Sequence, residues 1–251
     1  MARESEILIG YYRRTASNYD ITRFPWQSGP LGAIEQESVS KVLNGKLVLE
    51  CGVGSGRFPL SIRKECLFVG CDVSREMISL CKEKLEAANV DANLVLADAR
   101  ALPIRDDVFD SVLCSRTFKF FSRPWEFLRE AKRCLRKTGK CIISVGTSDS
   151  FWYKLAVRLG LIRLDDKENA SREHYYSKPE IRCLLEEIGF ANFRIMAIGN
   201  VLFGLYSFIW FKIYDKPIAK LFKHFPASLV KSFLKPGRQR FTSQVLIVCD
   251  K

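Results

Sequence analysis

The chain has 251 residues, of which 47% are hydrophobic and 27% are charged. A chain of about this length buries enough surface to fold without disulfides or metal ions, and its composition excludes disordered, collagen-like and multi-span membrane proteins. The 40 lysines and arginines outnumber the 28 aspartates and glutamates, which gives a net charge of +12. Such a surface favours anionic partners, namely nucleic acids, anionic lipids or acidic small molecules.

Nine cysteines occur along the chain, none of them in a C-x-x-C pair, and most lie among apolar residues. This pattern is typical of small buried side chains in a reducing compartment. We therefore predict a cytoplasmic protein without a metal site, and the first residues show no apolar stretch typical of a secretory signal.

The first thirty residues mix aromatic side chains with arginines and predict an irregular or short-helical arm over 1–30. A helical pattern follows over residues 31–43. From there, short apolar runs alternate with amphipathic stretches. They predict strands at 47–49, 67–69, 93–96, 111–114 and 141–145, with helices near 56–65, 75–88 and 124–137. Such alternation indicates crossover connections, and therefore an α/β fold with a doubly wound parallel sheet covered on both faces.

The pattern becomes less regular after residue 146. Residues 147–176 form an insertion with a helix expected from Phe151, and a capping box at Ser177 and Glu180 predicts a helix that ends at Gly189. Strand-like segments at 192–198 and 243–249 enclose a basic, aromatic region, residues 200–240. We interpret the chain as a single domain, 1–251, with lid insertions at 147–176 and 200–240.

A glycine-rich turn follows the first predicted strand, in the order Glu50-Cys51-Gly52-Val53-Gly54-Ser55-Gly56-Arg57. Glycines at alternate positions let the backbone turn sharply and leave room for a ligand beside it. The dinucleotide pattern G-x-G-x-x-G requires glycine where this chain has Arg57, so the turn favours a nucleoside over a pyrophosphate.

Two carboxylates end the next two predicted strands. Asp72 lies twenty residues after Gly52, where a carboxylate can accept hydrogen bonds from both ribose hydroxyls. Asp98 ends the third strand and suits the amine edge of adenine. Either residue could instead cap a helix, but together with the glycines they predict a nucleoside site at the carboxyl edge of the sheet.

From Val48 to Val145 the chain resembles the class I S-adenosylmethionine-dependent methyltransferases, through the motifs E-C-G-V-G-S-G, C-D-V-S, A-D-A-R-A-L-P and F-D-S-V-L-C-S-R. It looks most like the subgroup that methylates small molecules, quinones and lipids. The resemblance implies a Rossmann-like seven-stranded sheet whose last strand, residues 244–248, is antiparallel. It also implies S-adenosyl-L-methionine as the cofactor, with S-adenosyl-L-homocysteine as the product.

The same resemblance implies roles for individual residues. Glu50 would orient the methionyl amino end, Asp72 would hold the ribose, and Asp98 with Ala99 would hold the adenine. The pattern A-x-x-Y-D, here Ala16 to Asp20, often folds over the cofactor in this family. The full set of expected cofactor contacts is Tyr19, Glu50, Gly52, Gly54, Gly56, Asp72, Val73, Met77, Asp98, Ala99 and Cys114.

The acceptor site is expected between the arm and the segment after the fourth strand, with Tyr12, Arg116, Phe118 and Phe121 as its substrate contacts. His174, one of two histidines, lies just before a predicted helix start and could serve as a base. A histidine in such a place is more often a structural loop residue.

The basic region 200–240 holds eight lysines and arginines against Asp215 alone. One helix in it has the pattern of a helix that lies on a membrane surface. The other interpretation is a basic, solvated face over an apolar lid. The uncharged run 195–211 is interrupted by Gly199, Asn200 and Gly204, which disfavours a membrane span.

The sequence therefore predicts methyl transfer to a small, lipophilic acceptor, with a peripheral membrane contact as one interpretation of the basic region. Two alternatives stay open. An RNA methyltransferase would use the positive surface, although no N-P-P-Y motif follows the fourth strand. A protein that binds the cofactor without transferring its methyl group would show the same motifs.

Overall fold

The structure, a computed structural model, describes residues 2–23, 29–61, 66–160, 173–199 and 244–251. Its centre is a seven-stranded sheet with the strand order β3-β2-β1-β4-β5-β7-β6. The strands are β1 (Leu47–Cys51), β2 (Leu67–Asp72), β3 (Asn93–Leu96), β4 (Phe109–Ser115), β5 (Leu135–Gly146), β6 (Ala191–Ala197) and β7 (Gln244–Asp250). The longer helices are α1 (Ala2–Thr15), α4 (Pro30–Ser40), α5 (Arg75–Ala87), α6 (Pro124–Cys134), α7 (Phe151–Arg158) and α8 (Lys178–Ile188).

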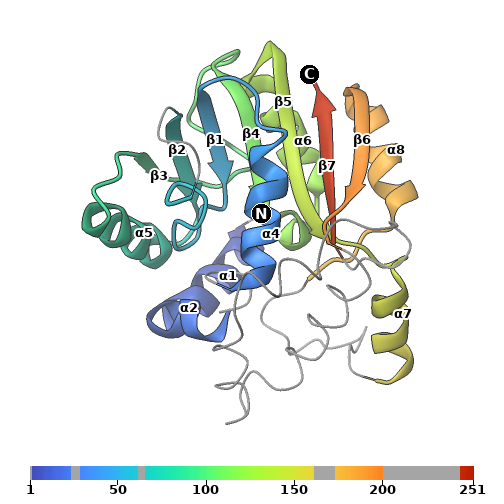
Figure 1. Ribbon diagram of the computed structural model, residues 1–251, viewed down its shortest axis with the longest axis horizontal. Coiled ribbons are helices and arrows are strands. Elements are labelled where there is room, and N and C mark those ends of the chain that lie inside the picture. The colour runs from blue at the N-terminus through green and yellow to red at the C-terminus, as the bar shows by residue number, and fades with distance from the viewer. Residues whose placement is uncertain (1, 24–28, 62–65, 161–172, 200–243) are drawn as a thin grey trace.

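The strands from β1 to β5 pair in parallel, whereas β7 is antiparallel to both of its neighbours, β5 and β6. Figure 1 shows the arrow of β7 pointing against that of β5. The predicted Rossmann-like α/β sheet with an antiparallel last strand is therefore confirmed. The carboxyl ends of β1, β2, β3 and β4 meet at one edge of the sheet, which is where open α/β sheets bind ligands.

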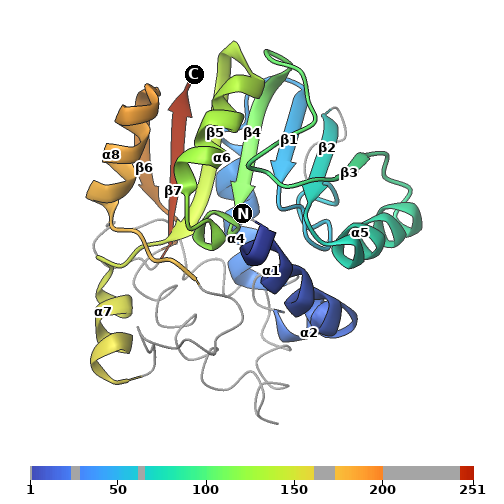
Figure 2. The same cartoon turned by 180° about the vertical axis from the view of Figure 1, so that it is seen from behind.

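Helices cover both faces of the sheet (Figures 1 and 2), and an apolar layer lies on each face. Val48 of β1 lies in one layer with Leu31 of α4, whereas its neighbour Leu49 lies in the other with Phe127 of α6 and Leu185 of α8. Successive residues of a strand point to opposite faces, so a strand that is buried on both sides consists of apolar residues throughout. This explains the continuous apolar runs in the sequence.

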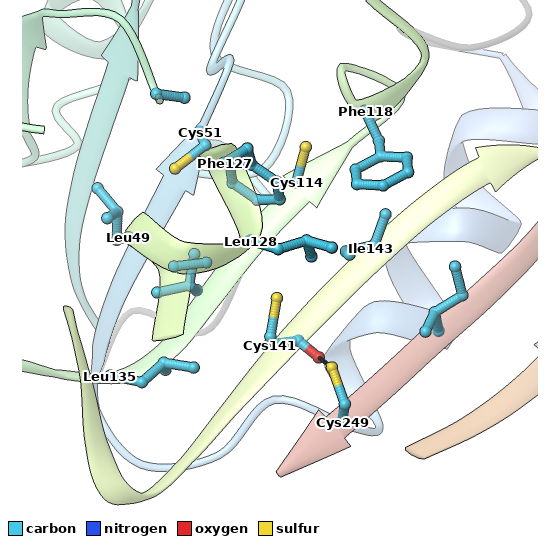
Figure 3. Close-up of a cluster of buried hydrophobic side chains, with 14 of the residues drawn as sticks. Leu49, Cys51, Cys114, Phe118, Phe127, Leu128, Leu135, Cys141, Ile143 and Cys249 are labelled. Atoms are coloured by element: carbon cyan, nitrogen blue, oxygen red, sulfur yellow. Dashed lines mark hydrogen bonds between the residues drawn. The ribbon is translucent and has the colours of Figure 1, made fainter. Parts of the chain in front are cut away.

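Cysteines fill part of the second layer. Figure 3 shows Cys51, Cys114, Cys141 and Cys249 among leucine and phenylalanine side chains, and all four are fully buried. Hydrogen bonding to Cys71 and burial raise the pKa of the Cys51 thiol well above its usual value, and burial does the same to the pKa of Cys114. These thiols therefore act as small hydrophobic side chains, as the sequence predicts.

The helix ends follow the expected capping chemistry. Ser177 and Glu180 form the predicted capping box at the start of α8, and Gly189 ends that helix in the left-handed conformation with φ of +78°. Ser150 caps the predicted helix from Phe151, which is α7. Each side-chain oxygen satisfies a backbone N–H that has no partner within the helix.

Three predicted elements differ from the structure. Residues 54–61 form turns, so the helix expected near 56–65 is wrong over its described part. Gly56 has φ of +83°, which a right-handed helix cannot contain. Helix α6 ends at Cys134 instead of residue 137, and β5 starts at Leu135 instead of residue 141, because Leu135 pairs with Phe109 and both side chains are buried.

The N-terminal arm is also more regular than expected. Residues 2–15 form the continuous helix α1, followed by a 3-10 turn (Ala16–Asn18) and the short helix α2 (Tyr19–Thr22). Figure 2 shows α1 crossing the carboxyl edge of the sheet. Asp20 connects the arm to the glycine-rich turn and to α5. It accepts a hydrogen bond from Ser55 Oγ at 2.7 Å and pairs with Lys84 Nζ at 2.5 Å.

The basic region 200–240 lies outside the described residues, as does most of the second half of the insertion 147–176, so the lid and membrane interpretations of these segments stay predictions. Within the described ranges, no helix is both long enough and apolar enough to cross a membrane.

Candidate functional site

The glycine-rich turn leads from β1 over the carboxyl edge of the sheet. Gly52 has φ of +80°, and a Cβ there would lie 2.2 Å from Thr117 Oγ1, so this position accepts no side chain. Gly54 has φ of +53°, and a Cβ there would meet no atom within 4 Å. The turn therefore packs tightly against the segment after β4 at Gly52 and borders open space at Gly54.

That open space belongs to a cavity of about 930 Å³, a volume that includes its open mouth. The turn after β1, the ends of β2 and β3, the segment after β4 and helix α1 all contribute to its wall. The cavity lies at the carboxyl ends of the parallel strands, which is where open α/β sheets bind their ligands.

Asp72 at the end of β2 organises the floor of this cavity. Its carboxylate accepts hydrogen bonds from the backbone N–H of Gly54 at 3.0 Å and of Ser74 at 2.9 Å. Burial raises the pKa of Asp72 above its usual value, and these backbone donors oppose the increase. The side chain thereby joins the glycine turn to the start of α5 and still borders the cavity, as an acceptor for ribose hydroxyls must.

Glu50 at the end of β1 is more deeply buried, and burial raises the pKa of its carboxyl group well above the usual value. Its Oε2 atom has no hydrogen-bond partner among the described residues, although the residue borders the cavity. A buried acceptor without a donor is uncommon in native proteins. The ammonium group of a methionyl moiety would supply that donor, so this position fits the expected cofactor.

Asp98 follows β3 and is held by its neighbours in the sequence and in α1. Arg100 donates to it through Nε at 3.0 Å and Nη2 at 2.7 Å, and Ser5 Oγ donates at 3.1 Å. Burial acts to raise the pKa of Asp98, but the hydrogen bonds from Arg100 outweigh it and lower the pKa. Ala99 lines the cavity beside it, which leaves an apolar wall and a carboxylate for an adenine ring.

Of the predicted site residues, eleven line the cavity: Tyr12, Tyr19, Glu50, Gly52, Gly54, Asp72, Val73, Asp98, Ala99, Arg116 and Phe121. The Tyr12 and Tyr19 rings meet edge to face, 5.9 Å apart, so the arm brings both to the same wall. The motifs from the arm and from four strands therefore converge on one cavity.

Five other predicted site residues do not line it. Gly56 packs against Cys81, so closely that a Cβ on the glycine would lie only 2.8 Å from the sulfur, and Met77 and Cys114 are buried in the core. Phe118 is buried against the rings of Phe121, Phe127 and Tyr176. These residues support the cavity wall from behind.

His174, the fifth, also lies away from the cavity wall. Its backbone N–H donates to the carbonyl of Lys119 at 2.7 Å, and its ring lies 6.3 Å from that of Tyr176. This placement gives the predicted role as a base no support. In the described part of the chain, no three histidine, cysteine, aspartate or glutamate side chains gather closely enough to hold a metal ion.

A buried polar network behind the cavity was not predicted from the sequence. Glu35 of α4 pairs with Arg57 at 2.9 Å, and its other oxygen accepts hydrogen bonds from Ser115 and Ser144. Burial acts to raise the pKa of Glu35, but Arg57 and Arg116 lower it below its usual value. Two signals were present: Glu35 lies one helical turn from both Leu31 and Val39 on the apolar face of α4, and Arg57 replaces a glycine of the dinucleotide pattern.

Comparison with known proteins identifies the fold. Residues 49–143 match the model of a methyltransferase domain. A solved S-adenosylmethionine-dependent methyltransferase of Thermotoga maritima superposes with a TM-score of 0.64 at 21% identity, covering 99% of each chain.

Several curated relatives match part of the chain. An uncharacterised protein of Methanocaldococcus jannaschii is 30% identical over 58% of this chain and 65% of its own length. A tRNA (carboxymethyluridine(34)-5-O)-methyltransferase of Xenopus tropicalis is 30% identical over 57% of this chain and 21% of its own. A demethylmenaquinone methyltransferase of Thermus thermophilus is 29% identical over 39% of this chain and 46% of its own.

The chain thus spans less than two thirds of the length of these curated relatives. The family model covers the glycine turn and the carboxylates at the ends of β1, β2 and β3, so residues 49–143 match a methyltransferase domain, and the chain has the fold of a solved S-adenosylmethionine-dependent methyltransferase.

Proposed function

We propose that the protein transfers the methyl group of S-adenosylmethionine to a small, lipophilic acceptor. The observation that carries this proposal is the composition of the cavity wall after β4. Beyond the glycine turn and Asp72, the wall continues with Phe120 and Phe121, and the arm adds Tyr12 and Tyr19. Aromatic side chains on both sides favour an acceptor with an apolar body.

When bound, the cofactor supplies an activated methyl group on a positively charged sulfur. The chain's own residues would then hold the two reactants: Asp72 the ribose, Glu50 the amino end and Asp98 with Ala99 the adenine. Holding two reactants in line can lower a barrier by roughly 7–11 kcal/mol. The acceptor itself would attack the methyl group, and the sulfur would keep the electron pair of the broken bond, so transfer needs no nucleophilic side chain.

A second candidate is methylation of RNA, because four of the similar proteins are named as tRNA methyltransferases. The net charge of +12 suits a nucleic acid. The small-molecule proposal is favoured by the aromatic wall and by the similarity to demethylmenaquinone methyltransferases. Contact of the region 200–240 with a membrane surface, and location in the cytoplasm, remain parts of this proposal.

Transfer of a tritiated methyl group tests the proposal directly. The full chain would be incubated with labelled S-adenosylmethionine and either a lipid extract or total RNA. We expect label in the lipid extract, a strong loss in Asp72→Asn, and no loss in Asp110→Asn, which changes a carboxylate at the opposite edge of the sheet. Label in RNA alone would support the second candidate, and cofactor binding without any transfer would support a non-catalytic protein.

A further inference from the structure

The segment after β4 gathers positive charge at the acceptor end of the cavity. Arg116 follows β4 directly and lines the cavity together with Arg57. Lys119 lies one turn further on, and burial, with help from Arg116 and Arg23, lowers the pKa of Lys119 to about 8. The influence of Arg23 on both Arg116 and Lys119 places these cations within electrostatic range of one another.

Carboxylates at this end are fewer than cations. Glu35 pairs with Arg57, and Glu173 pairs with Lys119 while accepting a hydrogen bond from Tyr175 at 2.8 Å. Glu50 ends the neighbouring strand β1, but burial raises the pKa of its carboxyl group well above the usual value, which favours the uncharged form. Asp72 ends β2, one strand further from β4. Among the described residues, the acceptor end therefore carries a surplus of positive charge.

Arg116 is held in an unusual backbone conformation. Its φ is +57°, a left-handed value that is strained for a residue with a Cβ. Its N–H donates to the carbonyl of Ser144 at 2.9 Å, which fixes the residue between the ends of β4 and β5. The surrounding sheet thus maintains a strained residue whose side chain borders the cavity.

Two tyrosines of the N-terminal arm share the cavity with this guanidinium. Tyr12 and Tyr19 line the same cavity, and burial raises the pKa of both phenols. They therefore remain protonated and able to donate hydrogen bonds. Phe120 and Phe121 provide the apolar surface next to Arg116.

We propose that the acceptor carries an oxyanion, a carboxylate or a phosphate, which binds to Arg116 while its apolar body lies against Phe120 and Phe121. This inference rests on the proposed function, since it names the class of acceptor for the same cavity. A guanidinium presents its donors in a planar fork that matches both carboxylates and phosphates. A site with surplus positive charge and an apolar wall prefers an amphiphilic anion to the corresponding neutral molecule.

The test compares ligands that have the same ten-carbon alkyl group and differ only in the polar group at its end. Binding of decanoate, decyl phosphate and decanol to the full chain would be measured by calorimetry in saturating S-adenosylhomocysteine. We expect one or both anions to bind about tenfold or more tightly than decanol. The two anionic arms show which oxyanion the site prefers.

Two substitutions that each remove one positive charge show whether the preference for anions depends on Arg116. Arg116→Gln should abolish the preference for the anions, whereas Arg136→Gln should keep it, because Arg136 pairs with Asp110 at the opposite edge of the sheet. Arg116→Lys retains the charge and should retain part of the preference. The ligand comparison with the unchanged protein needs no variant and holds even if Arg116→Gln folds poorly.

Failure of the inference and failure of the proposed function give different results. If S-adenosylhomocysteine does not bind, the proposed function fails. If it binds and decanol binds as tightly as both anions, the oxyanion site is wrong. The inference is also overturned if Arg116→Gln weakens S-adenosylhomocysteine itself, because Arg116 would then hold the cofactor. Displacement of decanoate by tRNA, with the same dependence on Arg116, would assign the anion to a nucleic acid instead.

Discussion

The two halves of the cavity wall differ in charge and in the way their side chains are held. The ends of β1, β2 and β3 present carboxylates, namely Glu50, Asp72 and Asp98, whereas the segment after β4 presents Arg116 and aromatic rings. Backbone N–H groups hold Asp72, and an arginine holds Asp98. We call these the acidic half and the basic half of the cavity.

This difference indicates how one cavity can accommodate two unlike molecules. A cofactor with hydroxyl groups, an amine and a positive sulfur suits the acidic half. The proposed acceptor, an oxyanion with an apolar body, would suit the basic half. The two halves remain distinct because the buried ion pair behind the cavity, Glu35 with Arg57, is neutral as a whole and adds no net charge to either half.

The largest effect should follow from breaking that pair. Glu35→Gln places an amide donor against the Arg57 guanidinium and leaves a buried charge without its counterion, so we expect the free energy of unfolding to fall by about 3–5 kcal/mol. Urea unfolding measures this change in the free energy of unfolding. Glu37→Gln is the matched control, because Glu37 pairs with Lys41 on the exposed side of the same helix and should change stability by less than about 1 kcal/mol. Equal losses in both variants would contradict the prediction.

A smaller effect, on binding, should follow from changing the acidic half. Asp72→Asn retains the size of the side chain but loses the charge that receives ribose hydroxyls, so affinity for S-adenosylhomocysteine should fall by about 10- to 100-fold, or about 1.4–2.8 kcal/mol. Calorimetry measures this affinity.

Asp110→Asn is the control for that variant. Asp110 also accepts two backbone hydrogen bonds, from Lys46 and Leu47 at 2.9 Å each, but at the far edge of the sheet. It should lose stability and keep its affinity. If both variants lose affinity equally, Asp72 acts only through the fold.

The acidic half could largely be predicted from the sequence, because its residues lie at fixed places in a local pattern. Gly52 and Gly54 come just after β1, and Asp72 is the last residue of β2. Parallel strands bring their carboxyl ends together, so these residues lie close in space. The same reasoning predicted the parallel sheet, and the family resemblance implied its antiparallel last strand. Prediction failed for residues 56–61, where Gly56 adopts a left-handed conformation that the surrounding residues do not reveal.

The basic half and its support were harder to predict, because they depend on contacts between distant segments. Glu35 meets Ser144 across 109 residues and Ser115 across 80. Neither pair leaves a periodic signal.

Phe118 and Phe121 are two phenylalanines of the same short segment, and the sequence predicts both as substrate contacts. Only Phe121 reaches the cavity, because the 3-10 turn Phe118–Phe120 directs Phe118 into the core.

The pH dependence of stability should separate Glu50 from the other carboxylates. Burial raises its folded-state pKa, so its contribution to stability is complete below the unfolded pKa of about 4.3 and is lost as the pH rises through the folded value. Glu50→Gln cannot ionise. The variant should therefore gain stability relative to the unchanged protein as the pH increases above about 4.3, as measured by urea unfolding from about pH 5 to pH 8. Parallel curves for the two proteins would show that Glu50 is not buried as described.

The smallest effect should come from the link between α1 and the acidic half. Ser5 Oγ donates to Asp98 and accepts from Arg100 Nη2 at 2.7 Å, so Ser5→Ala should cost about 0.5–1.5 kcal/mol and speed hydrogen exchange in α1. Ser38→Ala is the control, because Ser38 Oγ donates within its own helix, to the carbonyl of Ile34, and alanine is the better helix former. Its stability should stay the same or rise. If Ser5→Ala leaves hydrogen exchange in α1 unchanged, the contacts of Asp20 hold the arm instead, and the hydrogen bond between Ser5 and Asp98 does not stabilise α1.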